Sequence, residues 1–154
     1  MQARIDLGQA AEGAYKAMLG LETYVRRSGL ERSLVELVKV RASQINGCAY
    51  CIDMHWKDAR AAGESEQRLY SLDAWRETPF YTDRERAALE WTESVTLLSE
   101  THVPDEVYDR VRAHFGEEEL VNLTMAVVTI NAWNRLAVSF RSVPGIYQAA
   151  ATHP

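Results

Sequence analysis

The sequence predicts an all-α protein, a compact multi-helix domain with about six to eight helices. Apolar residues recur at helical spacing in nearly every segment, and no segment alternates apolar and polar residues beside hairpin turn signals. Glycine, proline and asparagine-glycine pairs interrupt this pattern where helices are expected to end. With 154 residues and 47% apolar composition, the chain has the usual size of one domain, so we expect a single domain over residues 1–154.

Four helices are predicted in the first half of the chain. Each shows mostly helical spacing of its apolar residues and is followed by residues that terminate helices. The expected ranges are about 9–27, 31–45, 48–62 and 64–75. The terminating residues are Gly29, the pair Asn46-Gly47, Gly63 and the pair Thr78-Pro79.

Three further helices are predicted in the second half. Thr82 and Glu85 have the spacing of a capping box, and they open a helix whose inner face includes Leu98. Pro104 introduces the next helix, and a long apolar helix follows it. The expected ranges are about 82–99, 104–116 and 117–141.

Charge and composition exclude several classes of function. The formal net charge of −5 gives no reason to expect a nucleic acid or an anionic membrane as partner. The most apolar stretch, 120–140, is interrupted by Asn122, Asn131, Asn134 and Arg135, which are costly inside a bilayer, so it is predicted to be a core helix. The first residues lack the features of a secretory signal. We therefore expect a cytoplasmic protein.

The stretch from Glu36 to His55 contains the two cysteines of the chain, Cys48 and Cys51, directly after the asparagine-glycine pair. If a helix begins at Cys48, His55 lies about 40° from Cys51 and about 20° from Cys48 around the axis, so the three side chains share one face. A thiol in the first turn lies near unpaired N–H groups and the positive end of the helix dipole, which favour the thiolate. His55 can take the thiol proton or stabilise the anion.

Several kinds of site can use such a cysteine pair. In a reducing compartment, redox or metal chemistry is more expected than a structural disulfide. Structural zinc needs a fourth ligand besides Cys48, Cys51 and His55. The candidates for that ligand are His102, His114 and His153. Covalent haem attachment requires a histidine where Ile52 stands, and a thioredoxin-like site requires a preceding strand. A redox-sensing or zinc-binding helical module, or two buried cysteines without chemistry, stay open as alternatives to an enzyme.

The same residues resemble a known family. Glutamate, eleven residues, C-x-x-C, three residues and histidine, as in Glu36, Cys48, Cys51 and His55, is similar to the motif of the alkylhydroperoxidase D (AhpD) family. This family lies within the carboxymuconolactone decarboxylase superfamily. The segment T-I-N-A-W-N-R-L-A, at 129–137, is similar to the late helix of many small members, so the resemblance covers about residues 30 to 140.

The resemblance implies a peroxidase that works by a dithiol-disulfide cycle. Cys51 would attack the peroxide, and Cys48 would resolve the resulting sulfenic acid into a redox-active Cys48-Cys51 disulfide. His55 would accept the Cys51 proton, and Glu36 would orient the imidazole. No cofactor besides this disulfide is implied. The substrate would be a small peroxide or disulfide, and an unidentified thiol would serve as reductant.

The chain departs from the family pattern at one position. Well-studied members have a histidine between the cysteines, where this chain has Ala49-Tyr50. A phenol titrates near about 10, so Tyr50 can donate a hydrogen bond to a thiolate but is a poor base at neutral pH. The branch that decarboxylates a muconolactone generally lacks the C-x-x-C pair, so decarboxylation is the less expected reaction.

We also expect a homo-oligomer. An all-helical chain with a long apolar final helix and many aromatic residues has more apolar surface than one bundle needs. The family resemblance implies a trimer or a hexamer, and closed symmetry is usual for identical chains.

Overall fold

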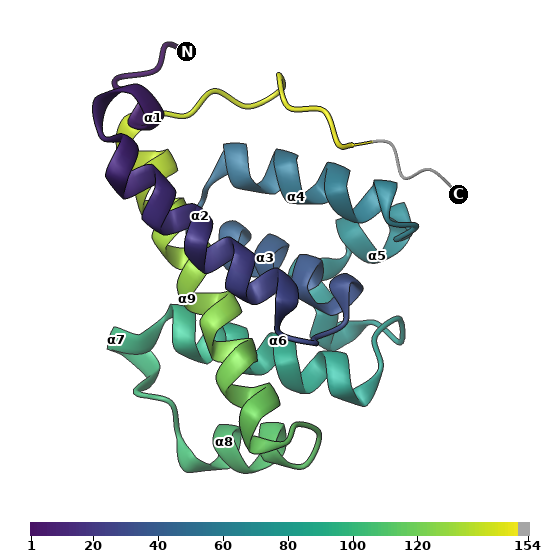
Figure 1. The fold of residues 1–154 in the computed structure, drawn as a ribbon. Helices are drawn as coiled ribbons and strands as arrows, with labels where there is room; N and C mark the ends of the chain where they lie inside the picture. The colour runs from purple at the N-terminus through teal and green to yellow at the C-terminus, as the bar shows by residue number, and fades with distance from the viewer. Residues whose placement is uncertain (151–154) are drawn as a thin grey trace.

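The computed structural model describes residues 1–150. Over this range the chain forms nine α-helices, one 3₁₀ helix and no strand, which confirms the predicted all-α class (Figure 1). The expected number of about six to eight helices is too low, because α1, α7 and η1 are too short to show a periodic pattern. The elements are α1 (Leu7–Ala10), α2 (Glu12–Arg27), α3 (Arg32–Ile45), α4 (Ala49–Ala61), α5 (Glu66–Tyr70), η1 (Leu72–Glu77), α6 (Asp83–Thr96), α7 (Leu98–Thr101), α8 (Asp105–Arg112) and α9 (Glu117–Phe140).

The helix predicted over 82–99 is divided in two. Its start is as predicted, because the Thr82 side chain accepts the N–H of Glu85 and the Glu85 carboxylate accepts the N–H of Thr82 at 2.8 Å. Its end is not, because α6 stops at Thr96 and the backbone changes direction at Leu97. Leu98 is 55% exposed, so its expected place on the inner face was wrong.

The corner between α3 and α4 follows from the asparagine-glycine pair. Gly47 has a φ of 64°, a conformation that glycine adopts without the steric cost that a Cβ brings. Its N–H donates to the carbonyl of Gln44 at 3.1 Å, and the N–H of Cys48 donates to the carbonyl of Ser43 at 3.0 Å. These two bonds form a Schellman motif, which ends α3 and places Cys48 directly at the start of α4.

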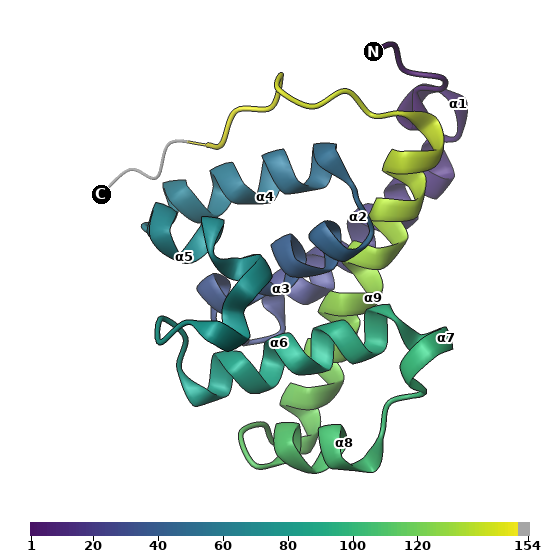
Figure 2. The same ribbon diagram turned by 180° about the vertical axis from the view of Figure 1, so that it is seen from behind.

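Helix α3 lies at the centre of the fold and packs against α4, α6 and α9 (Figures 1 and 2). One apolar core joins α3 to α2, α6, α8 and α9, and a second joins it to α4, α5, η1 and α6. The first core includes Leu34, Val38, Trp91, Phe115, Leu123 and Val127, and the second includes Leu37, Val40, Leu69, Leu72, Trp75 and Leu89. Burial of each such side chain contributes about 1.5–3 kcal/mol, so α3 is held on both sides.

Helix α9 is part of the core, as predicted for 120–140, and buries residues such as Leu123 and Ile130. Within residues 1–150, none of the helices combines the length and the apolar composition that crossing a bilayer requires.

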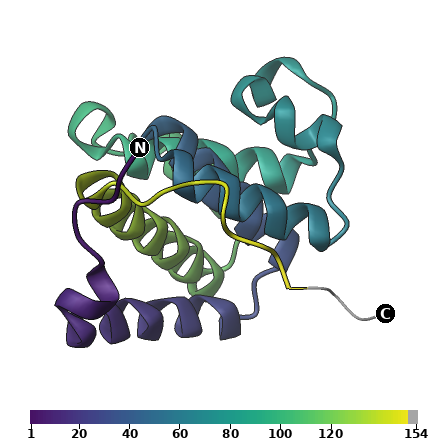
Figure 3. The same cartoon turned by 90° about the horizontal axis from the view of Figure 1, so that it is seen from above.

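Residues 142–150 form a C-terminal strap that runs back along α4 (Figures 1 and 3). Arg141, in a left-handed conformation, ends α9 and starts the strap. Three hydrogen bonds then tie the strap to α4: Gly145 N–H to Asp53 at 3.0 Å, Lys57 to the carbonyl of Tyr147 at 3.0 Å, and the Tyr147 hydroxyl to Asp58 at 2.7 Å. The strap therefore covers the helix that carries the two cysteines.

Candidate active site

The two cysteines lie at the N-terminus of α4, where the sequence predicts them. Cys48 is the N-cap residue, and its sulfur accepts the backbone N–H of Cys51 at 3.4 Å. Both are free thiols, with exposed fractions of 1% and 2%. Their thiols are therefore close together, buried and in contact with the positive end of a helix.

The two thiols ionise as a pair. A hydrogen bond from the Cys51 thiol lowers the pKa of Cys48 to about 7, against the effect of burial, and the backbone N–H of Cys51 and the Asn134 side chain assist. The same hydrogen bond, burial and the negative charge on Cys48 raise the pKa of Cys51. The first negative charge therefore belongs to the pair and rests on Cys48, while Cys51 keeps its proton.

Glu36 and His55 form a buried pair beside the cysteines, as the motif predicts. His55 Nδ1 lies 2.9 Å from Glu36 Oε2. Burial raises the pKa of Glu36, but the hydrogen bond from His55 and the positive charges of His55, Lys39 and Arg32 outweigh burial, so the pKa is lowered. The ionised carboxylate accepts the Nδ1 hydrogen and leaves Nε2 as the atom for proton transfer.

His55 Nε2 is buried and has no hydrogen-bond partner among the described residues. The structure thus contains the predicted Glu36-His55 pair but no direct hydrogen bond from Cys51 to His55. The atom that Cys51 contacts as a donor is instead the sulfur of Cys48.

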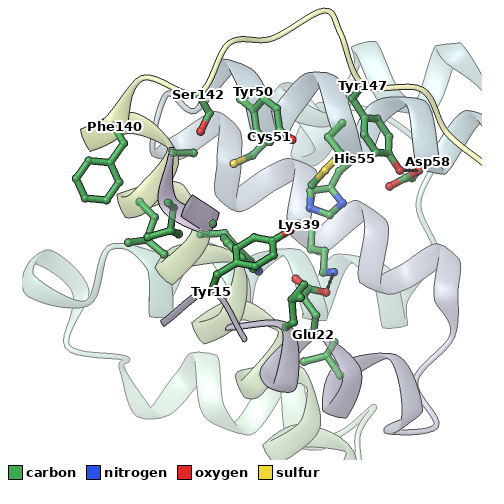
Figure 4. Close-up of a pocket in the computed structure, with 18 of the residues that line it drawn as sticks. Tyr15, Glu22, Lys39, Tyr50, Cys51, His55, Asp58, Phe140, Ser142 and Tyr147 are labelled. Atoms are coloured by element: carbon green, nitrogen blue, oxygen red, sulfur yellow. Dashed lines mark hydrogen bonds and ion pairs between the residues drawn. The ribbon is translucent and has the colours of Figure 1, made fainter. Parts of the chain in front are cut away.

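A cavity of about 830 Å³ opens beside these residues (Figure 4). Cys51 and His55 line it, whereas Cys48 does not. Its apolar wall includes Tyr15, Leu19, Met54, Trp133, Leu136 and Phe140. Its polar residues include Glu22, Glu36, Lys39, His55 and Asp58. Of the two thiols, Cys51 is therefore the one that a molecule in the cavity meets.

Two polar pairs in the cavity were not anticipated from the sequence. Lys39 and Glu22 form an ion pair at 2.7 Å with both side chains largely buried. The strap contributes the Tyr147 hydroxyl, which donates to Asp58; burial and this hydrogen bond raise the pKa of Tyr147 to about 12. A usable signal was the helical spacing of three that separates Lys39 from Glu36 and Asp58 from His55.

Tyr50, which stands where the family has histidine, also lines the cavity. Burial is the main cause that raises the pKa of Tyr50. The phenol therefore stays protonated at neutral pH, as expected from the sequence.

Among the described residues, Glu36, His55 and Asp58 form the one group of metal-ligating side chains whose ligand atoms lie within 4.8 Å of one another. This group contains no thiol, so Cys48 and Cys51 do not join His55 in the zinc site considered from the sequence. His102 and His114 belong to no such group, and His153 lies outside the described residues.

Comparison with known proteins identifies the family. The sequence model of the carboxymuconolactone decarboxylase family matches residues 12–94, which is more than half of the chain. The chain belongs to the carboxymuconolactone decarboxylase family. It is 47% identical to the uncharacterized protein YdfG of Bacillus subtilis over 139 residues, which cover 90% of this chain and 95% of YdfG.

Solved structures place the chain within this family. A protein of unknown function from Agrobacterium tumefaciens, assigned provisionally to antioxidant defence of the AhpD type, has 48% sequence identity and a TM-score of 0.92. That match covers 95% of this chain and 100% of the other. The chain is thus an AhpD-like member of the carboxymuconolactone decarboxylase family. The debrominase Bmp8 has a TM-score of 0.80 at 20% identity, over 91% of this chain and 75% of Bmp8, which shows a shared fold alone.

Proposed function

We propose that this protein is a thiol-dependent peroxidase that cycles between the Cys48-Cys51 dithiol and its disulfide. The observation that carries the proposal is the placement of Cys51. It faces a cavity beside a buried Glu36-His55 pair, and the sulfur of Cys48, which does not line the cavity, accepts the backbone N–H of Cys51. A nucleophile, a resolving thiol and an oriented imidazole are the groups that this reaction needs.

In the first step, the Cys51 sulfur attacks the terminal oxygen of the peroxide. A sulfur-oxygen bond forms, the oxygen-oxygen bond breaks, and Cys51 is oxidised to a sulfenic acid while the peroxide is reduced. The Cys51 proton passes to the Cys48 thiolate, its existing hydrogen-bond partner. His55 Nε2 donates a proton to the departing oxygen, which leaves as an alcohol or as water.

In the second step, the Cys48 sulfur attacks the sulfenic sulfur of Cys51. The disulfide forms, and hydroxide leaves as water with the proton that Cys48 releases. Two electrons and two protons from an external thiol reductant then restore the dithiol. The net reaction consumes one peroxide and yields one alcohol and one water for each disulfide that is formed.

The cavity supports an organic hydroperoxide more than hydrogen peroxide as the substrate. A volume of about 830 Å³ with an aromatic and aliphatic wall exceeds what hydrogen peroxide needs. Sites of this size and composition bury most of the surface of a drug-sized ligand. Burial of a ring or an alkyl chain in the cavity would orient the hydroperoxide group towards Cys51.

Other functions of proteins with this fold are alternatives to the proposed peroxidase. Bmp8 has the same fold and is a debrominase, so the fold alone does not specify peroxide chemistry. The muconolactone decarboxylation that gives the family its name is less supported, because it does not use a dithiol. A redox sensor would use the same disulfide without turnover.

We further propose that the protein is a homo-oligomer, either a trimer or a hexamer. Apolar side chains of α2 and α9 are exposed outside the cavity, at exposed fractions of 44–59%. They include Tyr24, Val121, Val128 and Val138. A contact between copies would cover such a surface.

The experiment that tests the peroxidase follows loss of a ring-bearing hydroperoxide and of hydrogen peroxide in the presence of a small dithiol as reductant. We expect turnover by the wild-type protein and loss of one disulfide equivalent of free thiol per peroxide when no reductant is added. Cys48→Ser is expected to react once and stop as a sulfenic acid at Cys51, which a dimedone adduct identifies. An adduct on Cys48 in Cys51→Ser, and none on Cys51, would reverse the two roles. Absence of turnover with a reversible disulfide would favour the redox sensor.

A further inference from the structure

The last helix brings a buried carboxamide to the dithiol. Asn134, on the apolar helix α9, is 1% exposed and lies one turn from Ile130, which packs against Cys48 and Cys51. A hydrogen bond from its side chain lowers the pKa of both thiols. The two ends of a carboxamide have opposite effects at such a place, because an N–H donor stabilises a thiolate and a carbonyl oxygen repels it. The effect of Asn134 therefore depends on which end faces the sulfurs.

The hydrogen bonds on one side of Asn134 decide its orientation. The Ser43 hydroxyl donates to the backbone carbonyl of Lys39 at 2.7 Å, which uses its single hydrogen. Ser43 Oγ can then only accept from Asn134, whose Nδ2 lies 3.0 Å away. The amide nitrogen of Asn134 must therefore point towards Ser43.

The hydrogen bonds at the oxygen of Asn134 indicate the same orientation of its amide. Asn131 Nδ2 donates to the backbone carbonyl of Val127 at 2.9 Å, so the oxygen of Asn131 faces Asn46. Asn46 Nδ2 then donates to the oxygens of Asn131 at 3.0 Å and of Asn134 at 2.8 Å. The backbone carbonyls of Lys39 and Val127 lie at the two ends of this hydrogen-bond network, and they thus determine the orientation of every side-chain amide between them.

We infer that Asn134 is a catalytic residue of the dithiol site, whose amide N–H stabilises the negative charge on either sulfur. One of its two N–H hydrogens goes to Ser43, and the other is left for the sulfur pair. Because it contacts both sulfurs, the same donor serves Cys48 at rest and Cys51 during attack. Asn46, which holds the oxygen of the amide, is a positioning residue. The role in turnover rests on the proposed peroxidase function, whereas the effect on the thiols does not.

Charged and titratable groups from other helices also face the site. The ones that share the cavity with Cys51 include Tyr15 and Glu22 of α2, Glu36 and Lys39 of α3, and Tyr50, His55 and Asp58 of α4. Asn134 differs from all of these because it is neutral at every pH and reaches the sulfurs from α9. Its contribution is therefore separable from theirs by a substitution that leaves the cavity unchanged.

The test is Asn134→Asp, which keeps the size of the side chain but replaces the donor by a charged acceptor. We expect the lower thiol pKa, measured by ultraviolet absorbance of the thiolate, to rise by about one to two, equivalent to a roughly tenfold or greater loss of thiolate below that pKa. The reduction potential of the disulfide, measured against a dithiol redox buffer, should become more negative. The reason is that the donor stabilises the thiolate form more than the disulfide.

The chain offers a matched control in Asn122→Asp. Asn122 is also a buried asparagine of α9, donates to the carbonyl of Ser28 at 3.1 Å and accepts from Tyr24 at 2.7 Å. It lies about 18 Å along the helix from Asn134, so the same substitution should leave the thiol pKa and the potential unchanged.

Asn46→Asp tests the inference independently, including the case in which Asn134→Asp does not fold. Asn46 is only partly buried, and the substitution removes the donor that holds the Asn134 oxygen. We expect a smaller rise of the same thiol pKa. An unchanged pKa in folded Asn134→Asp, or in Asn46→Asp if Asn134→Asp does not fold, would overturn the inference. So would an equal rise in Asn122→Asp. No peroxide is used, so a protein that shows these shifts but no peroxide turnover would refute the proposed function alone.

Discussion

Removal of the Cys51 thiol tests how the cysteine pair holds its charge. In the structure the largest effect that lowers the pKa of Cys48 to about 7 is the hydrogen bond from Cys51. Cys51→Ala removes this donor. A hydrogen bond to a charged group contributes about 1.5–3 kcal/mol, and about 1.36 kcal/mol corresponds to one pH unit in pKa. Loss of this hydrogen bond should therefore raise the pKa of Cys48 by about one to two pH units. The pKa of Cys48 should rise from about 7 towards the free-thiol value near about 8.5.

At neutral pH this change lowers the thiolate fraction from about half to a few per cent, roughly a fifteenfold loss. Ultraviolet absorbance of the thiolate is the suitable assay, because both sulfurs are buried and alkylation would also report on access. Cys51→Ser is the matched control, since its hydroxyl can still donate to the Cys48 sulfur and should keep the pKa closer to about 7. A Cys48 pKa that stays the same in Cys51→Ala would refute the reasoning and leave the backbone N–H groups of Cys51 and Tyr50 and the Asn134 side chain as the donors that lower it.

Glu36, His55, the strap and the assembly of the protein can each be tested. Glu36→Gln should lower the rate of the first peroxide turnover about tenfold and His55→Ala about a hundredfold or more, with unchanged circular dichroism; wild-type rates in both would remove their assigned roles. Because the pKa of Glu36 is lowered, its stabilising effect is present above its ordinary pKa and is lost as pH falls through the folded value. Chemical denaturation should therefore show that the wild-type protein loses more unfolding free energy than Glu36→Gln between about pH 6 and about pH 3, and equal losses would contradict this. Tyr147→Phe removes the 2.7 Å bond to Asp58, so amide exchange in the strap should become faster while α4 is unaffected. Light scattering should give a trimer or hexamer mass across micromolar dilution, and a single-chain mass would rule out the proposed oligomer.

Prediction from the sequence was correct where residues within one short segment determine where a helix begins or ends. The Asn46-Gly47 pair ends α3 through hydrogen bonds within its own turn, and Cys48 then caps α4. The Thr82 and Glu85 capping box is equally local. Such features depend on residues within a few positions of one another, so their spacing is sufficient evidence.

Prediction failed where the apolar pattern does not mark the end of a helix or where a helix is too short to show a pattern. The apolar pattern continues through Leu98, but α6 ends at Thr96 and Leu98 is exposed. The turns of α1, α7 and η1 are too short for a periodic pattern to mark them. Neither error moves Glu36, Cys51 or His55, which lie on α3 and α4.

The sequence by itself determined that the chain is helical, that Cys48 and Cys51 begin a helix, and that Glu36 and His55 accompany them. Only the tertiary structure decided that Cys51, and not Cys48, faces the cavity, and that the Cys51 thiol contacts Cys48 instead of His55. The same is true of Asn134, whose amide bonds to Ser43 across 91 positions of the chain. The physical reason is range: helix starts and ends arise from neighbouring backbone groups, whereas a buried polar atom takes its partner from whichever distant segment packs against it.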